Sequence, residues 1–168
     1  MIQVQSLYSS SSINLVLNTG GPDETRSLGR ILGKLLQEGD VVALYGDLGS
    51  GKTCLVQGIA LGIGVKERYI TSPTFIMINE YTGRIPFYHI DLYRVAFSEL
   101  GGLGFRDYLS DGGATVIEWA ERAGDELPEE RLSIYLKITG EKSREIKFEG
   151  EGERYINLVK AFAERIGK

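Results

Sequence analysis

The sequence feature that constrains this chain most is a glycine-rich segment, Gly46–Thr53, which reads G-D-L-G-S-G-K-T. It matches the Walker A pattern G-x-x-x-x-G-K-[ST], in which small glycines let consecutive backbone N–H groups turn inward around a phosphate. In that pattern the lysine, here Lys52, reaches the β- and γ-phosphates, and the hydroxyl of Thr53 ligates magnesium. The segment therefore predicts a phosphate-binding loop that takes ATP or ADP together with Mg²⁺.

The segments on either side of this loop supply the context that the motif requires. Val41–Tyr45 is a continuous apolar run, as expected of a strand covered on both faces. After the loop, apolar residues recur at helical spacing, at Leu55, Val56, Ile59, Ala60 and Ile63. The start of that helix adds the positive end of its dipole to the phosphate site. The alternative is a glycine-rich turn between a strand and a helix, with a surface lysine.

Strand-like and helical segments alternate along the rest of the chain. A first helix is expected between the turn at 18–23 and Gly39, and a last helix carries apolar residues on one face from Tyr155 to Ile166. Residues 98–109 are broken by glycines into short helical pieces. Strands are expected at 13–17, 75–81, 86–92, 115–118, 132–138 and 145–148, with a hairpin joining 75–81 to 86–92.

This order of elements predicts an α/β fold. We expect one domain over residues 1–168, a P-loop NTPase-like three-layer sandwich whose central sheet mixes parallel and antiparallel strands.

Composition excludes several classes of protein. One cysteine excludes an internal disulfide and a multi-cysteine zinc site, and one histidine excludes a multi-histidine metal site. The net charge of −4 argues against a strong, autonomous nucleic-acid binder. No apolar run approaches the roughly 20 residues that span a bilayer, and the N-terminus lacks the pattern of a secretory signal. We therefore expect a cytoplasmic protein with no membrane partner.

A P-loop enzyme also needs a carboxylate that holds magnesium or orients water. Glu118 ends the apolar run 115–117 in a Walker B-like pattern, and Asp91 ends a strand-like segment in the string H-I-D-L-Y-R. Either residue is a candidate for this role. For both, the alternative is a surface carboxylate at the end of a strand.

Four further residues have a functional and an ordinary interpretation. Thr74 lies in T-S-P-T, where a hydroxyl could reach a γ-phosphate as in a switch loop, or where the chain simply turns. Trp119 follows Glu118 and suits either nucleotide contact or packing. His89, a lone histidine in a strand, is expected to be structural. Cys54 is expected to be a small buried side chain rather than a catalytic one.

Four blocks of sequence together resemble one family. G-D-L-G-S-G-K-T, S-P-T-F, H-I-D-L-Y-R and I-E-W-A-E-R occur in this order and spacing in the TsaE family, and the resemblance runs from about Asp23 to Gly150. TsaE proteins are small cytoplasmic P-loop ATPases of the bacterial pathway that makes threonylcarbamoyladenosine next to the anticodon of tRNA. The resemblance implies weak ATPase activity that the partners TsaD and TsaB stimulate, with tRNA held mainly by those partners.

Carried over by position, the resemblance implies roles for individual residues. Thr53 and Glu118 would hold magnesium, Asp91 would support the metal or the attacking water, Thr74 would act like a switch residue, and Trp119 would lie near the nucleotide. The residues implied in nucleotide binding around the loop are Gly49, Ser50, Gly51, Lys52, Thr53 and Cys54.

The resemblance also implies nucleotide contacts for three residues outside the loop. Asp23 and Thr25 match the family's start of the first helix, on the side where the adenine is expected, and Arg144 matches a late arginine that would also touch the nucleotide.

The sequence thus predicts an ATP-hydrolysing accessory protein in which Lys52 and Mg²⁺ neutralise charge on the γ-phosphate while Glu118 or Asp91 orients water or metal. Two alternatives stay open. A small P-loop kinase would transfer the phosphoryl group to an acceptor other than water. A nucleotide-gated binding module would bind ATP without releasing phosphate.

Overall fold

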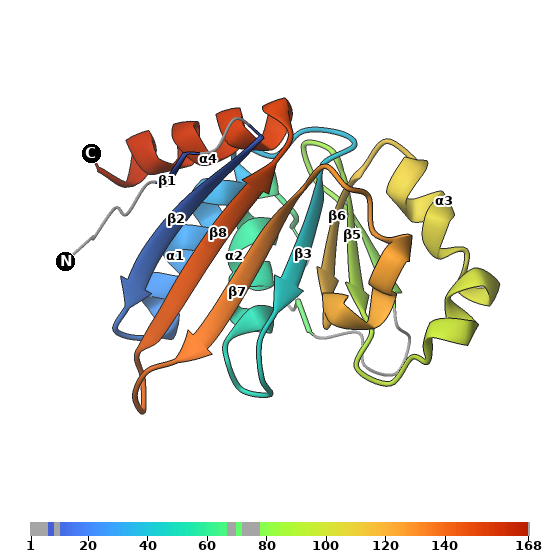
Figure 1. Cartoon of the computed structure of the whole chain (residues 1–168), viewed down its shortest axis with the longest axis horizontal. Helices are drawn as coiled ribbons and strands as arrows, with labels where there is room; N and C mark the ends of the chain where they lie inside the picture. The colour runs from blue at the N-terminus through green and yellow to red at the C-terminus, as the bar shows by residue number, and fades with distance from the viewer. Residues whose placement is uncertain (1–6, 9–10, 67–69, 72–77, 168) are drawn as a thin grey trace.

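The sheet at the centre of the chain mixes parallel and antiparallel strands. The computed structural model describes residues 7–8, 11–66, 70–71 and 78–167. Within these ranges the strands lie in the order β1-β2-β8-β7-β3-β6-β5-β4 (Figure 1). Their bounds are β1 Leu7–Tyr8, β2 Ser12–Thr19, β3 Val41–Tyr45, β4 Ile78–Thr82, β5 Pro86–Asp91, β6 Ala114–Glu118, β7 Arg131–Ile138 and β8 Arg144–Glu151.

The four middle strands, β7-β3-β6-β5, are parallel, and antiparallel strands extend the sheet on both sides. Burial follows this division. Residues 41–44 of β3 and all of β6 are buried, because both faces of the sheet are covered there. Buried and partly exposed residues alternate along β2, because only one of its faces is covered. The predicted mixed sheet is confirmed.

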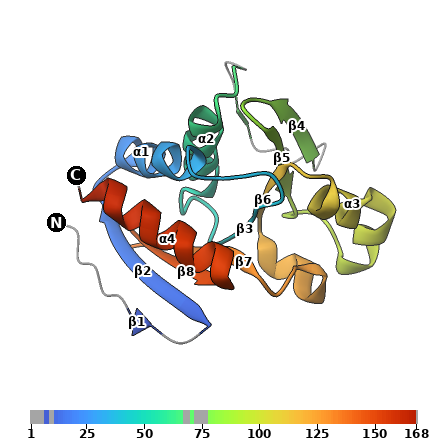
Figure 2. The same ribbon diagram turned by 90° about the horizontal axis from the view of Figure 1, so that it is seen from above.

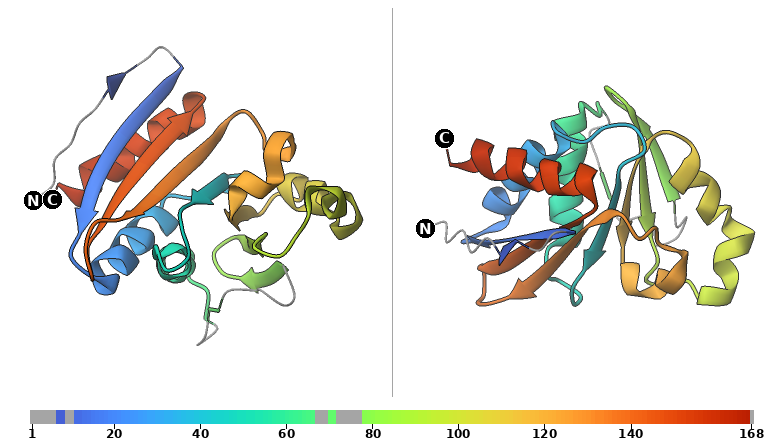
Figure 3. Two further views of the ribbon diagram at one scale, coloured as in Figure 1. Left: turned by 60° about the horizontal axis from the view of Figure 1, so that its bottom comes forward. Right: turned by 45° about the horizontal axis from the view of Figure 1, so that its top comes forward.

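Helices pack on both faces of the sheet, but over different strands. Three α-helices, α1 (Pro22–Gly33), α2 (Lys52–Ile63) and α4 (Glu153–Ile166), pack on one face and share a large apolar core with it. On the other face, α3 (Phe105–Ser110) and the 3₁₀ segments η1 (Phe97–Leu103) and η2 (Ala120–Glu126) cover β3, β6 and β5 (Figures 2 and 3). The predicted three layers are therefore present, with the third layer confined to this part of the sheet. In the described ranges, no helix is long and apolar enough to cross a membrane.

The parallel strands bring the candidate residues to one edge of the sheet. The phosphate loop follows β3, and Glu118 is the last residue of the neighbouring strand β6, where it lies opposite Leu44. Asp91 ends β5 and pairs in register with Glu118. Ligands of open α/β sheets bind at the carboxyl ends of the strands. The loop and both carboxylates therefore meet at that edge.

Most of the predicted elements are confirmed, and their bounds differ for physical reasons. The hairpin is present as β4 and β5, although residues 75–77 of the predicted strand lie outside the described residues. Strand β8 runs on to Glu151 because β2 and β7 both pair with its polar end. The first helix ends at Gly33 rather than near Gly39, since the Asp40 carboxylate accepts a hydrogen bond from the N–H of Gln37 (2.7 Å) and holds a turn there.

Helices α1 and α2 pack backbone against backbone through glycines. A Cβ atom at Gly58 would lie 2.1 Å from the carbonyl oxygen of Arg26, and one at Gly29 would lie 2.3 Å from the carbonyl oxygen of Leu55. Gly33 and Gly62 repeat this contact one turn further along. Because no side chain separates the two helices, α1 fixes the position of the helix that follows the phosphate loop.

We predict that Gly58→Ala destabilises the fold. Alanine favours a helix over glycine by about 1 kcal/mol, but its methyl group would have to push the two helices apart. Overpacking of this kind costs about 1–3 kcal/mol, and the cost at Gly58 should be at the upper end because the atoms on the other side of the contact are rigid backbone. After the gain in helix propensity is subtracted, the net loss of stability should be about 2 kcal/mol.

The loss is measured as the shift of the urea unfolding midpoint. Gly101→Ala is the control, because no atom lies within 4 Å of a Cβ atom placed at Gly101. Equal midpoints for Gly58→Ala and the wild type would contradict close helix packing.

Candidate functional site

The phosphate loop has a backbone that glycine makes possible. Gly51, the residue before α2, has a φ of 102°, in the left-handed region that other residues rarely adopt. Gly46 has a φ of 146°, and a Cβ atom there would lie 2.5 Å from the carbonyl oxygen of Leu136. The glycines of the motif therefore let the loop turn tightly beside β7.

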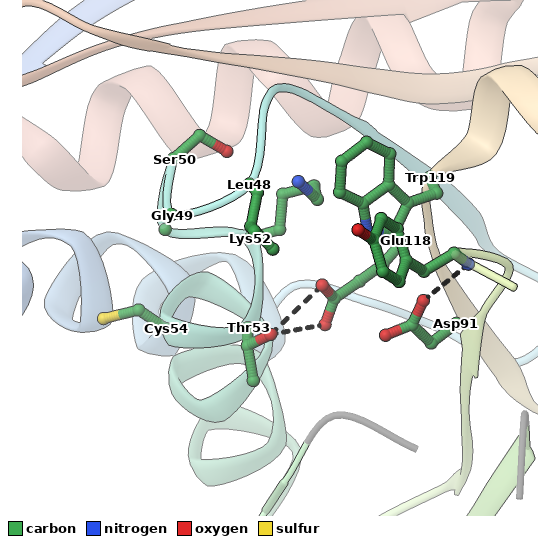
Figure 4. Close-up of a pocket in the computed structure, with 11 residues that line it drawn as sticks. Leu48, Gly49, Ser50, Lys52, Thr53, Cys54, Asp91, Glu118 and Trp119 are labelled. Carbon is green, nitrogen blue, oxygen red and sulfur yellow. Dashed lines mark hydrogen bonds between the residues drawn. The ribbon is translucent and has the colours of Figure 1, made fainter. Parts of the chain in front are cut away.

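A cavity of about 320 Å³ opens between this loop and the ends of β5 and β6. It brings together five residues that the sequence singled out, Lys52, Thr53, Asp91, Glu118 and Trp119, although they come from separate elements (Figure 4). The other lining residues are Leu48, Gly49, Ser50, Gly51, Cys54 and Tyr93.

Lys52 is the cation of this cavity. Its Nζ donates hydrogen bonds to the carbonyl oxygens of Gly46 (2.5 Å) and Asp47 (3.0 Å) and lies 4.0 Å from the centre of the Trp119 ring. Burial lowers the pKa of the Lys52 ammonium, and nearby carboxylates, Glu118 first among them, oppose that shift. The charge is therefore held next to the loop by weak backbone acceptors that a phosphate can replace.

The Glu118 carboxylate contacts the helix that follows the loop. The Thr53 hydroxyl lies 2.9 Å from Glu118 Oε1 and 3.1 Å from Oε2, and it donates to this carboxylate. Glu118 is only 2% exposed, and Asp91 beside it is 4% exposed, with its Oδ1 accepting the N–H of Tyr93 (2.9 Å). Figure 4 shows the Glu118 side chain between Thr53 and Asp91. Two buried carboxylates thus face the phosphate loop.

His89 belongs to the site, whereas the sequence indicated only a structural role. Its Nε2 lies 2.8 Å from Glu118 Oε1, and its side chain is fully buried. The sequence held only part of the signal, because Glu118 lies on another strand. His89 and Asp91 are two residues apart on one strand, so their side chains project from the same face of the sheet.

Trp119 adopts a backbone conformation that is unusual for a large residue. Its φ is 57° and its ψ is 44°, a left-handed conformation that costs about 1–3 kcal/mol and persists only where the surrounding structure enforces it. The Trp119 ring packs against that of Tyr93, with centroids 4.8 Å apart. These two rings form an aromatic wall of the cavity beside Lys52.

Arg144 holds the phosphate loop from outside. Its guanidinium donates to the carbonyl oxygens of Gly49 and Ser50, both at 3.0 Å, and to those of Gly140 (3.2 Å) and Ser143 (2.8 Å). The resemblance implied only a nucleotide contact for this arginine. The structure shows that it ties the loop to the β7–β8 turn.

A second cavity of about 250 Å³ lies on the other side of the loop. Thr25, Cys54 and Arg144 line it, and so do Glu141 and Lys142, which the sequence did not single out because only the fold brings their turn to the loop. Gly21, Pro22 and Gly51 complete the lining.

Thr25 and Asp23, which the resemblance implies on this side, differ in their burial. Thr25 is buried, and its hydroxyl lies 3.0 Å from that of Thr19. Asp23, by contrast, is 94% exposed in its side chain and pairs with Arg26 (2.7 Å), and it lines neither cavity beside the loop. Thr74 lies outside the described residues.

Cys54 lines both cavities, and its Sγ donates to the carbonyl oxygen of Pro22 (3.1 Å). Burial raises the pKa of the thiol, but the side chain is only partly buried, so the expected buried position is wrong.

The donor set of the first cavity fits a phosphate with magnesium. The Ser50 hydroxyl is buried in the loop and has no hydrogen-bond partner in the described part of the chain. Thr53 and Glu118 supply oxygen ligands of the kind that Mg²⁺ prefers. No set of three or more His, Cys, Asp or Glu residues within the described ranges is arranged to hold a metal. A magnesium ion here would therefore take its remaining ligands from phosphate oxygens and water.

Comparisons with known proteins agree on one family. The family model described as threonylcarbamoyl adenosine biosynthesis protein TsaE matches residues 19–146. The chain is 41% identical over 138 residues to the tRNA threonylcarbamoyladenosine biosynthesis protein TsaE of Bacillus subtilis, covering 82% of this chain and 86% of that protein. The Treponema pallidum protein of the same name is 44% identical over 124 residues, covering 73% and 91%.

A solved structure extends this likeness to the fold. The crystal structure of YdiB from Bacillus subtilis matches with a TM-score of 0.82 and 34% identity, covering 94% of this chain and 99% of that one.

We predict that Arg144→Lys loosens the phosphate loop. Lysine keeps the charge but lacks the planar fork that binds two carbonyl oxygens at once. A hydrogen bond from a charged group contributes roughly 1.5–3 kcal/mol, so amide hydrogen exchange in residues 46–51 should accelerate about tenfold or more. Arg165→Lys, at an exposed position near the end of α4, is the matched control. Unchanged exchange in the loop would show that Arg144 does not hold it.

Proposed function

Because the chain belongs to the TsaE family, we propose that it is a magnesium-dependent ATPase and an accessory protein in the threonylcarbamoyladenosine modification of tRNA. One observation carries the ATPase part of this proposal: the Thr53 hydroxyl and the buried Glu118 carboxylate meet at the end of the phosphate loop. A Walker A threonine beside an acidic strand end is the arrangement that P-loop enzymes use for Mg²⁺.

The two cavities suggest how ATP would lie. The phosphates would occupy the loop, with the γ-phosphate toward the cavity of Lys52, Glu118 and Trp119. The base would lie on the opposite side, in the cavity of Thr25 and Arg144. The Gly51 backbone and the Cys54 side chain line both cavities, which supports a single ligand crossing the loop between them.

The proposed reaction is attack of water on the γ-phosphate. Mg²⁺, held by Thr53 and Glu118, would neutralise phosphate charge. Lys52 would exchange the carbonyl oxygens of Gly46 and Asp47 for phosphate oxygens and stabilise the charge that develops on them. Asp91, which lies beside Glu118 in register, would orient the attacking water. The Trp119 ring would limit the access of other water to the phosphate.

Partner proteins would supply the tRNA chemistry. The net charge of −4 disfavours tight binding of tRNA by this chain alone. We propose that it acts with TsaD, which transfers the threonylcarbamoyl group, and with TsaB, and that it works in the cytoplasm with them. Stimulation of the ATPase by these partners follows from that proposal.

We predict that Glu118→Gln separates binding from hydrolysis. Glutamine keeps the size of the side chain but removes the charge that the metal requires, so phosphate release from ATP should fall about 10²-fold or more. ADP should still bind in calorimetry, because the phosphate loop and Lys52 are unchanged.

The exposed Glu164→Gln on α4 is the matched control and should hydrolyse ATP like the wild type. Wild-type hydrolysis by Glu118→Gln, measured with TsaD and TsaB present, would overturn the assignment and leave Asp91 as the leading carboxylate. Transfer of the phosphoryl group to an added acceptor instead of water would indicate a kinase, and ATP binding without phosphate release would indicate a binding module.

A further inference from the structure

The histidine of this chain lies directly behind the candidate metal ligand. His89 is on β5, it is fully buried, and its Nε2 is 2.8 Å from Glu118 Oε1. Its neighbour in register on β6 is Val116, two residues before Glu118. Side chains two apart on a strand share a face, so β5 presents His89 to the same side of the sheet as Glu118.

The surroundings of the other ring nitrogen, Nδ1, indicate which nitrogen carries the proton. His89 Nδ1 is buried and has no hydrogen-bond partner in the described part of the chain. A proton on Nδ1 would be a buried donor without an acceptor, which costs more than an unused lone pair. A proton on Nε2 has the Glu118 carboxylate as its acceptor. The proton that this environment stabilises is therefore the one on Nε2, which donates to Glu118.

Glu118 receives hydrogen bonds from two sides that differ in their relation to the metal. Thr53 donates from the end of the phosphate loop, and the same hydroxyl is the one that a Walker A site gives to magnesium. A hydroxyl can give an oxygen lone pair to the metal and still donate its proton to the carboxylate, so the Thr53 oxygen would then be shared between Glu118 and magnesium. The bond from His89, which lies in the middle of the sheet, involves no group of the phosphate loop.

We propose that His89 is a positioning residue that orients the Glu118 carboxylate for magnesium. The inference rests on the proposed nucleotide site. Partners of metal ligands fix ligand orientation, and their loss typically lowers metal affinity about 10- to 100-fold. His89 does not itself line the cavity, and its contact with the site is the bond to Glu118, so its effect on catalysis would pass through that carboxylate.

A first experiment detects the hydrogen bond between His89 and Glu118 in the wild-type protein. Because the chain has one histidine, ¹⁵N-histidine labelling gives the ring signals of His89 alone. We expect a protonated Nε2, an unprotonated Nδ1 and a slowly exchanging Nε2 proton whose resonance moves in Glu118→Gln. A proton on Nδ1, or rapid exchange between the two tautomers, would overturn the proposal without bearing on nucleotide binding.

A second experiment measures how His89 affects the magnesium dependence of ADP binding. ADP affinity is measured by calorimetry with Mg²⁺ and with EDTA for the wild type, His89→Met and His89→Gln. We expect His89→Met, which lacks a donor, to keep the affinity seen in EDTA and to need about tenfold more Mg²⁺ for the affinity seen with the metal. His89→Gln, whose amide can donate to Glu118, should recover most of that loss.

Phe87→Leu is the matched packing control, because Phe87 is fully buried on the same strand and face. It should lose stability in urea but keep the wild-type magnesium dependence. An unchanged magnesium requirement in folded His89→Met, or an equal shift in Phe87→Leu, would show a merely structural role. A wild-type protein that binds no ADP would overturn the proposed function instead, and the imidazole spectrum would still test the hydrogen bond.

Discussion

The site depends on the Glu118 carboxylate, which joins three separate elements. The hydroxyl of Thr53 at the start of α2 and the imidazole of His89 on β5 both bind this carboxylate, which itself ends β6. A buried charge is costly unless hydrogen bonds satisfy it, so these contacts are what allow a carboxylate at 2% exposure. They also hold the phosphate loop at a fixed place relative to the central strands.

Two further sets of contacts hold the phosphate loop and α2 in this position. Helix α1 packs on α2 through backbone contacts at Gly29 and Gly58, so the helix after the loop has little freedom to shift. Arg144 ties the loop itself to the β7–β8 turn through the carbonyl oxygens of Gly49 and Ser50. Inside the loop, the Ser50 N–H donates to the carbonyl oxygen of Asp47 (3.0 Å) and closes a turn. This preorganisation means that the ligand does not have to order the loop when it binds.

The sequence predicted the parts of this arrangement that are local, and it missed those that depend on the fold. The Walker A motif and its flanking periodicities were enough to predict β3, the loop and α2, because each is set by neighbouring residues. Glu118 was recognisable as a carboxylate after an apolar run. The contact of His89 with Glu118 requires the parallel pairing of β5 and β6, and the bonds from Arg144 to the loop cross 94 and 95 positions of the chain. Pairing of distant strands is not visible in a single sequence, so such roles emerge only from the structure.

We propose that ATP hydrolysis in this loop serves the modification of tRNA. The most direct test measures threonylcarbamoyladenosine formed on unmodified tRNA by TsaD and TsaB, with an activated threonylcarbamoyl donor, Mg²⁺ and ATP. With ATP near its wild-type Kd, we expect sustained product formation with the wild-type chain. Folded Lys52→Ala should give little product beyond the chain-free mixture, because losing a charge-assisted phosphate contact of roughly 1.5–3 kcal/mol weakens ATP binding about 10- to 100-fold. Equal product with Lys52→Ala, or with an ATP analogue that resists hydrolysis, would contradict this role of hydrolysis.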